Sequence, residues 1–288
     1  MVIYVDTRLS AQMKDSSSDL PSVTIITVCK NAGRDLICTC QSVLNQTFTN
    51  IQYIIQDAVS DDDITLSYLY SLQDSRVSVF SGSDSGIYDA MNRATEQAHG
   101  KWCIYLNAGD YFVSNESLAK IFTEAEKESK VDLFVFANYN EFDKTIKTYQ
   151  KKISGYFLYR NGINHQGQLW KTDVLKKYLP FDLNYKILAD QELLLRAFSS
   201  GITIKTSSSV GIVYKDMGLS AMPSVQSLKN MERERIRNSL FSPMENKIFF
   251  LIDLILLKPL RLKLVSTLRG TILFQFYVAF INRLNRVL

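Results

Sequence analysis

Residues 81–111 read SGSDSGIYDAMNRATEQAHGKWCIYLNAGDY and contain a turn, a helix and an apolar strand in succession. Apolar side chains at helical spacing predict a helix over 89–98, and a glycine ends it. Residues 102–106 are an apolar run of strand length that breaks into Asn-Ala-Gly-Asp at 107–110. A carboxylate at the carboxyl end of a buried strand in an α/β sheet points into the crevice where such sheets bind ligands. Asp110 is therefore the first candidate functional residue.

On both sides of this stretch, apolar runs of strand length alternate with amphipathic segments. We expect strands over 23–28, 51–56, 77–80 and 131–137. We expect helices over 36–44, 64–72 and 117–127, and a further helix from near Ala189. The polar alternation of 138–152 is typical of a hairpin or an edge strand, and 161–170 is expected to be a loop. Strands and helices alternating at this spacing predict a mostly parallel sheet with helices on both faces.

Five short segments match, in order, the motifs of one enzyme family. They are an apolar strand with a trailing Asn (23–31), Ser-Val-Leu-x-Gln-Thr (42–47), an acidic turn (57–62), Asp-x-Gly-Ile-Tyr-Asp-Ala-Met-Asn (84–92) and Leu-Asn-x-x-Asp (106–110). On these motifs the chain resembles the family 2 glycosyltransferases, most of all their bacterial exopolysaccharide and colanic-acid members. The likeness thins after residue 111 and is nearly absent after 220. It implies a GT-A fold, which is a Rossmann-like α/β sheet flanked by helices, and transfer of a sugar from a nucleotide diphosphate to an acceptor hydroxyl.

The resemblance implies a divalent cation, Mg²⁺ or Mn²⁺, bound by Asp110. Such a cation neutralises the charge of the nucleotide diphosphate as it leaves. Asp110 matches the last acid of the family's metal motif, whereas Asn107 replaces the first acid and would contact the ribose or act through water. The alternative for Asp110 is a turn at the strand end in which its carboxylate caps the following segment.

The resemblance also implies a set of residues that bind the nucleotide sugar. They are Asp57, Asp84, Asp89, Asn92, Asn107 and His165. A carboxylate accepts hydrogen bonds from a base N–H or a ribose hydroxyl, which suits Asp57 and Asp89. Asp89 has the alternative role of a first-turn acid that complements the helix dipole. Residues 58–59, Ala-Val, stand where the family has glycines. His165 and Gln166 stand where similar enzymes carry His-Gln near the acceptor or the diphosphate, and the alternative is a structural histidine.

Asp190 opens the amphipathic segment Leu-Ala-Asp-Gln-Glu-Leu-Leu-Leu-Arg, some eighty residues after Asp110. The resemblance implies that Asp190 is the general base of an inverting transfer, the group that takes the proton of the acceptor hydroxyl. The alternative is a helix N-cap, with Glu192 and Arg196 forming an i, i+4 pair on the outer face.

Composition predicts a flexible leader (1–20), and the resemblance implies a GT-A catalytic domain (21–220) followed by a C-terminal helical, membrane-associating segment (221–288), within which the charge changes at about residue 244. The leader carries charges and a Ser-rich run in place of the apolar core of a secretory signal. Residues 245–288 carry seven basic and two acidic side chains, whereas the whole chain has a net charge of +4. The positive charge is therefore local, and a body that is not basic disfavours nucleic-acid binding.

The basic C-terminal segment is also strongly apolar, but it lacks the run of about twenty apolar residues that a membrane span needs. On a helical projection six of its seven basic residues fall in one sector, roughly 100° wide. They are Lys247, Lys258, Arg261, Arg269, Arg283 and Arg286. This pattern predicts an amphipathic helix on an anionic membrane surface, and the alternative is a helical pair packed on the domain or in a dimer.

Four cysteines without paired spacing favour a reducing compartment, so we expect a cytoplasmic protein, peripheral on the inner face of the cell membrane.

These patterns predict a metal-dependent, inverting glycosyltransferase of polysaccharide biosynthesis, such as that of an exopolysaccharide or a capsule. Its acceptor is expected to be a saccharide or a lipid-linked saccharide. A hydrolase of the same nucleotide sugar is the nearest enzymatic alternative. A catalytically silent scaffold that binds nucleotide sugars is the alternative from another class, because Asn107 weakens the metal motif.

Overall fold

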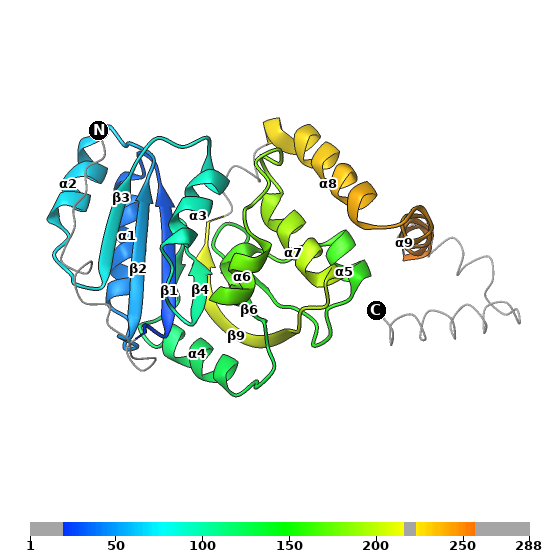
Figure 1. Cartoon of the computed structure of the whole chain (residues 1–288), viewed down its shortest axis with the longest axis horizontal. Helices are drawn as coiled ribbons and strands as arrows, with labels where there is room; N and C mark the ends of the chain where they lie inside the picture. Colours follow the sequence, from blue (N-terminus) through cyan, green and yellow to red (C-terminus); the bar gives the residue numbers. More distant parts are fainter. Residues whose placement is uncertain (1–19, 216–222, 257–288) are drawn as a thin grey trace, which may run out of the picture.

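One mixed β-sheet runs through the part of the chain that the computed structural model describes, residues 20–215 and 223–256 (Figure 1). Its strands are β1 (Val23–Cys29), β2 (Ile51–Asp57), β3 (Val77–Ser81), β4 (Trp102–Tyr105), β5 (Tyr111–Phe112), β6 (Leu133–Asn140), β7 (Thr145–Lys147), β8 (Gln168–Lys171) and β9 (Ile204–Tyr214). Their order across the sheet is β3-β2-β1-β4-β8-β6-β9-β5, and β7 pairs with β6 outside this path.

Helices lie between the strands and follow them at the C-terminal end. The α-helices are α1 (Gly33–Leu44), α2 (Asp63–Ser71), α3 (Ile87–Glu96), α4 (Ser117–Glu126), α5 (Gly155–Arg160), α6 (Thr172–Tyr178), α7 (Ala189–Ser199), α8 (Gln226–Leu240) and α9 (Pro243–Leu256). Two short 3₁₀ turns are η1 (His165–Gly167) and η3 (Pro223–Val225). Within the described residues, each helix and strand expected from the sequence is present, with ends shifted by up to three residues.

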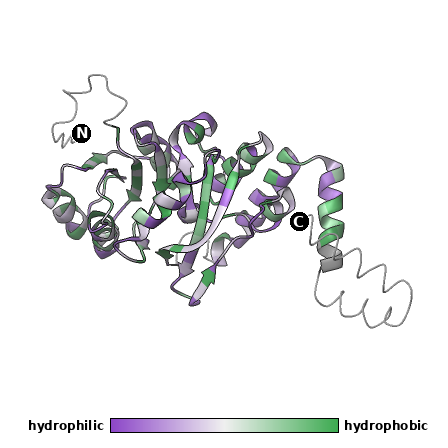
Figure 2. Cartoon of the chain, turned by 90° about the horizontal axis from the view of Figure 1, so that it is seen from below, coloured by the Kyte–Doolittle hydropathy of each residue, from purple (hydrophilic) through white to green (hydrophobic). Residues whose placement is uncertain are grey.

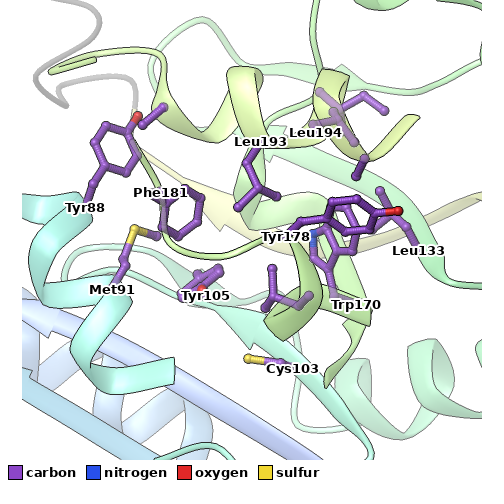
Figure 3. Close-up of a cluster of buried hydrophobic side chains, with 14 of the residues drawn as sticks. Tyr88, Met91, Cys103, Tyr105, Leu133, Trp170, Tyr178, Phe181, Leu193 and Leu194 are labelled. Carbon is purple, nitrogen blue, oxygen red and sulfur yellow. The ribbon is translucent and has the colours of Figure 1, made fainter. Parts of the chain in front are cut away.

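The central strand β1 explains the layering, because all seven of its residues are buried. Successive side chains of a strand point to opposite faces, so a strand covered on both faces reads as an unbroken apolar run. Ile26 contributes to the apolar cluster that contains Met91 of α3, together with residues of α6 and α7 (Figure 3). Ile25 contributes to a second cluster that contains Leu36 of α1. The helices thus cover both faces, as predicted.

The second half of the sheet differs from the expected loop at 161–170. Residues Gln168–Lys171 form β8, which lies between β4 and β6 and runs antiparallel to both. Leu169 and Trp170 are buried, so the segment contributes core side chains despite its short length. The order β3-β2-β1-β4 is parallel, as is the pair β6-β9, whereas β5, β7 and β8 pair antiparallel. Three of the cysteines are buried, but Cys38 is exposed.

Two helices of the described chain, α8 and α9, come after the last strand, β9. Helix α8 packs beside α7, and α9 follows it, with apolar residues along most of its length (Figure 2). In the described ranges, no helix has both the length and the apolar character to cross a bilayer. The predicted leader, apart from its last residue, and the predicted basic segment from residue 257 onward lie outside the described residues.

Candidate active site

The predicted site residues gather at the edge of the sheet where the parallel strands end. Asp57 is the last residue of β2 and pairs with Cys29 of β1 and Ser81 of β3. The 106–110 turn follows β4, whose Tyr105 pairs with β1. These ends lie on one edge because neighbouring parallel strands run in the same direction. That edge is where open α/β sheets bind their ligands.

Asp110 is nearly buried, with 6% of its surface exposed. Thr39 of α1 fixes the turn, since its hydroxyl donates to the Asp110 carbonyl at 2.7 Å and lies 2.9 Å from the N–H of Gly109. The amide nitrogen of Gln166 donates to Asp110 Oδ2 at 3.2 Å. Burial raises the pKa of Asp110 to about 6, although nearby positive charge and hydrogen bonds lower it. A buried carboxylate of this kind is stabilised in its charged form by a cation.

His165 connects Asn107 to Asp190. Its Nδ1 lies 3.2 Å from Asp190 Oδ2, and its Nε2 lies 3.0 Å from Asn107 Nδ2. An amide nitrogen only donates, so Nε2 of His165 accepts from Asn107, and Nδ1 is the ring nitrogen that donates to Asp190. In the described part of the chain, the buried Asn107 Oδ1 has no hydrogen-bond partner. That oxygen is therefore free to bind a ligand group.

Asp190 lies in the first turn of α7, where the N-cap residue is Leu188. The capping alternative for Asp190 is therefore wrong. Its Oδ1 accepts from the hydroxyl of Tyr88 at 3.0 Å and from the N–H of Gln191 at 2.9 Å. The same tyrosine hydroxyl lies 2.8 Å from the carbonyl of Ile187. The Asp190 side chain keeps 17% of its surface exposed, so an acceptor hydroxyl can reach it.

The i, i+4 pair of α7 forms, but it does not lie on an outer face. Arg196 Nε donates to Glu192 Oε1 at 2.9 Å, and Glu192 is buried. Arg196 also donates to the carbonyl of Tyr178 at 2.6 Å. The pair therefore joins α7 to the end of α6.

Asp57 is buried, and its carboxylate is held by hydroxyl groups. Its Oδ2 accepts from Ser81 Oγ at 2.8 Å and from the N–H of Ser60 at 3.1 Å. Val59, in the turn that follows, has φ +56°, the left-handed region that glycine favours. The chain therefore makes the tight turn of the motif although valine stands in a position where the family has glycine.

Asp84 and Asp89 are bound within their own turn. Asp84 Oδ1 accepts from the N–H of Gly86 at 3.0 Å, and Asp89 Oδ2 accepts from the N–H of Ser85 at 2.9 Å. Asp89 also forms an ion pair with Arg93 at 3.0 Å. The hydrogen bond from Ser85, more than the charge of Arg93, lowers the pKa of Asp89. The described contacts match the first-turn role, and donor binding by these two residues stays a prediction.

Both the oxygen and the nitrogen of the Asn92 side-chain amide hydrogen-bond to the backbone of Phe181. Its Oδ1 accepts from the N–H of Phe181 at 2.7 Å, and its Nδ2 donates to the carbonyl of Phe181 at 3.1 Å. The ring of Phe181 packs against Tyr88 and Tyr105, at centroid distances of 5.4 and 5.8 Å (Figure 3). These contacts give Asn92 a structural role, and its contact with the donor stays a prediction.

Two residues of the site region, Tyr88 and Lys215, escaped the sequence reasoning. Tyr88 lies inside the 84–92 motif and contacts Asp190, whereas Gln166, which the sequence placed beside His165 near the acceptor or the diphosphate, contacts Asp110. Lys215 follows β9 and forms an ion pair with Asp35 at 2.7 Å. Its positive charge also lowers the pKa of Asp110, although burial has the larger, opposite effect. No sequence signal marks Lys215, because it reaches the site through the pairing of β9 with β5.

The oxygen atoms at the turn after β4 fit a cation that is shared with a phosphorylated ligand. Among the described residues there is no group of three or more His, Cys, Asp or Glu side chains that could hold a metal ion. Asp110 and the free Asn107 Oδ1 supply the hard oxygen donors that Mg²⁺ and Mn²⁺ prefer. Mg²⁺ commonly binds through one or two carboxylates together with the substrate's phosphates. The donor set fits that arrangement better than an all-protein cage.

The fold and the acidic residues at the ends of its parallel strands define an α/β protein with a ligand-binding edge at the carboxyl ends of those strands. The model of the family "Glycosyl transferase family 2" matches residues 24–181, more than half of the chain, and the chain belongs to this family. The family-level resemblance is thereby confirmed. The matched range contains Asp57, Asp110 and His165 and ends before Asp190.

Two sequence relatives are glycosyltransferases by name. The PGL/p-HBAD biosynthesis glycosyltransferase of Mycobacterium tuberculosis is 27% identical over 188 residues, which cover 62% of this chain and 71% of that protein. The UDP-Glc:alpha-D-GlcNAc-diphosphoundecaprenol beta-1,3-glucosyltransferase WfaP of Escherichia coli is 33% identical over 119 residues, which cover 41% of this chain and 45% of that protein.

Two solved structures share the fold. S. aureus TarS 1–349 in complex with UDP-GlcNAc superposes with a TM-score of 0.65 at 16% identity, over 89% of this chain and 78% of that chain. The mannosyltransferase PcManGT from Pyrobaculum calidifontis, in complex with GDP-Man and Mn²⁺, gives a TM-score of 0.57 at 14% identity, over 92% and 80% of the two chains. At these identities the likeness establishes the fold alone.

Proposed function

We propose that this chain is an inverting glycosyltransferase that moves a sugar from a nucleotide diphosphate to a hydroxyl of a saccharide or lipid-linked saccharide in polysaccharide biosynthesis. The contact of Asp190 with His165 carries this proposal. It joins a partly exposed carboxylate of α7 to Asn107, in the same turn as Asp110. A base for the acceptor and ligands for the leaving group then share one site, as a single displacement requires. The names of WfaP and of the TarS complex, which contain UDP-Glc and UDP-GlcNAc, also support a nucleotide-sugar donor.

Asp190 is the proposed general base. The acceptor oxygen forms its bond to the anomeric carbon as the bond from that carbon to the diphosphate oxygen breaks, and the hydroxyl proton passes to Asp190. This one displacement inverts the anomeric configuration. Hydrogen bonds from Tyr88 and His165 hold the two oxygens of the carboxylate, so its orientation is set before the acceptor arrives.

Asp110 and Asn107 are the proposed ligands of Mg²⁺ or Mn²⁺. The bound cation would neutralise the charge that develops on the diphosphate. Asp57, Asp84 and Asp89 are the proposed contacts to the nucleoside or ribose, because their carboxylates accept hydrogen bonds from N–H and hydroxyl groups.

The silent scaffold remains the alternative from another class, and the hydrolase remains the enzymatic one. A scaffold needs the donor contacts but no ordered carboxylate beside them. The Asp190–His165–Asn107 series therefore supports an enzyme, because it fixes a base next to the proposed leaving-group ligands.

A panel of UDP-, GDP- and dTDP-sugars, scored by thermal shift with and without Mn²⁺, tests the function. One nucleotide class should stabilise the protein, and more strongly with Mn²⁺; ligand at 100 times its Kd adds about 2.7 kcal/mol. That donor is then incubated with saccharide and lipid-linked saccharide acceptors, and NMR gives the anomeric configuration of the product. A retained configuration contradicts the inverting mechanism. Donor binding without product supports the scaffold, and release of free sugar alone supports the hydrolase.

We further propose that residues 221–288 attach the catalytic domain, 21–220, to the anionic cytoplasmic face of the cell membrane. Helix α9 packs through Phe249 against Tyr159 and Phe241, at centroid distances of 4.9 and 5.4 Å. It also carries four apolar side chains that are 46–71% exposed: Met244, Ile248, Phe250 and Leu251. Residues 257–288 add six basic side chains and no acidic one. Exposed apolar side chains followed by positive charge suit an anionic bilayer surface.

A further inference from the structure

Glu232 of α8 is a buried carboxylate that the proposed chemistry does not use. It is 5% exposed, and its two oxygens accept hydrogen bonds from three consecutive backbone N–H groups. The donors are Lys186 at 2.6 Å, Ile187 at 3.0 Å and Leu188 at 2.9 Å. A buried charge is tolerated when hydrogen bonds of this kind surround it. These three hydrogen bonds therefore connect α8 to residues 186–188, the segment before α7.

The N-cap residue of α7 is Leu188, whose apolar side chain cannot accept a hydrogen bond. Helices usually carry Ser, Thr, Asp or Asn at this position to bind the free backbone N–H groups. Glu232 supplies an acceptor from another helix for the N–H of Leu188 and for the two N–H groups before it, and its negative charge lies at the positive end of the α7 dipole. The chain that enters α7 is thus held by α8.

The same segment leads directly to the proposed base. Leu188 precedes Asp190 by two residues, and the carbonyl of Ile187 accepts from the Tyr88 hydroxyl that also contacts Asp190. A shift of residues 186–188 would therefore move the Asp190 carboxylate relative to His165. Misplacement of a reacting group by about 1 Å can lower a rate by about 10²-fold.

Helix α8 is itself fixed on the body of the protein. It lies beside α7 (Figure 1), and its Ile236 is buried in the apolar cluster that contains Leu193 of α7. Arg237 donates to the carbonyl of Tyr159 at 2.9 Å, and its guanidinium lies 3.9 Å from the centroid of that ring. Glu232 therefore links α8, which is packed against the body of the protein, to residues 186–188, which lead to Asp190.

We propose that Glu232 is a positioning residue for glycosyl transfer, which acts by fixing the start of α7 and with it the carboxylate of Asp190. This proposal rests on the proposed role of Asp190 as general base. It makes α8, which follows the predicted domain boundary at residue 220, a working part of the active site.

The test compares Glu232→Gln and Glu232→Asp in the full-length chain with the matched control Glu234→Gln, an exposed glutamate on the same helix. The donor is the nucleotide sugar that gives the largest thermal shift with Mn²⁺ in the panel, used with its acceptor. We expect both Glu232 variants to lose about tenfold or more in kcat, while the donor KM stays within about twofold. Amide hydrogen exchange should accelerate at residues 186–190 in both variants. The control should match the parent in all three measurements.

The rate of each variant is divided by the concentration of protein that binds donor, which gives the kcat of the folded molecules. If Glu232 only stabilises the fold, its loss lowers the folded fraction but leaves this kcat unchanged. If Glu232 positions Asp190, this kcat falls. Glu232→Asp keeps the charge on a shorter side chain, so it provides the measurement if Glu232→Gln does not fold. Parental kcat in either Glu232 variant, or unchanged exchange at 186–190, overturns the proposal. Asp190→Asn distinguishes the two hypotheses: parental turnover in that variant refutes the base, whereas its inactivity beside a fully active Glu232→Gln refutes only the role of Glu232.

Discussion

Replacing Asp110 with Asn should separate the stability of the fold from the chemistry of the site. The two side chains have nearly the same shape, and the amide oxygen can still accept from Gln166. Burial raises the pKa of Asp110 from 3.8 to about 6 in the folded protein, and a shift of about two units corresponds to about 3 kcal/mol. Because the folded-state pKa is the higher one, the ionised carboxylate lowers the free energy of unfolding by about this amount above pH 6, and the effect vanishes below about pH 4.

Without divalent cations, Asp110→Asn should therefore be more stable than the parent at neutral pH, by up to about 3 kcal/mol. The difference should shrink as the pH falls through the window between about 6 and 4. Urea unfolding in EDTA at several pH values measures it, and Asp63→Asn, which removes an exposed aspartate of α2, is the control. A difference that does not vary with pH, or a variant less stable than the parent above pH 6, would refute the reasoning.

The same variant should lose glycosyl transfer even in saturating Mn²⁺. A neutral amide binds a hard divalent cation more weakly than a carboxylate does, so the ion that Asp110 is proposed to hold would be lost. The additional thermal shift that Mn²⁺ gives to the donor complex should disappear as well. Normal turnover in saturating Mn²⁺ would show that Asp110 is not the metal ligand, whatever the stability measurement gives.

Three further variants test the rest of the site and the C-terminal segment. Asp190→Asn should bind donor as the parent does but lose about 10²-fold or more in kcat; a matching loss of donor affinity would instead assign Asp190 to binding. Tyr88→Phe should lower kcat by about tenfold, whereas Tyr105→Phe, which removes a buried hydroxyl bonded to Thr95, should not; equal losses would contradict a specific role for Tyr88. Truncation after Leu256, which leaves the packed part of α9 in place, should release the protein from anionic vesicles. Replacing Lys258, Arg261 and Arg269 with Gln should weaken binding to anionic vesicles more than to neutral ones. This difference should shrink as the salt concentration rises, because salt screens exposed charges. Equal vesicle binding by the full-length and truncated chains would favour the packed-helix alternative.

The parallel half of the sheet could be predicted from the sequence because its signals are local. β1 is buried on both faces and reads as an unbroken apolar run, so its identity needs no knowledge of its neighbours. Asp57 ends β2 and Asp110 follows β4. Their positions at the carboxyl ends of these strands were enough to predict from the sequence that they lie at the ligand-binding edge. Helix ends were less certain, since the first turn of α1 contains no apolar residue that would mark its start.

Strands β5, β8 and β9 could not be predicted, because their contacts join distant segments. β8 has only four residues, too few for a period, and it is a strand because β4 and β6 supply partners on both sides. The capping alternative for Asp190 arose from the same limit: the sequence shows an acid at a helix start but does not show that Glu232 binds the N–H groups before it. An acceptor forty-four residues away leaves no pattern in the local sequence.

Asp110 and Asp190, the two carboxylates of the proposed chemistry, are held by different parts of the chain. This difference decides how much of the chain the proposed activity needs. Among the described contacts, Asp110 is fixed by Thr39 of α1, by Gln166 of η1 and by a backbone hydrogen bond from Lys215 after β9. Asp190 is held by α3 through Tyr88, by η1 through His165, and by α8 through the backbone that Glu232 binds. A boundary at residue 220 would keep every side chain of the proposed chemistry but remove the support for the base. A fragment that ends there should bind donor through Asp110 and its neighbours yet transfer sugar poorly, because the Glu232 proposal predicts a catalytic unit that extends at least through the end of α8.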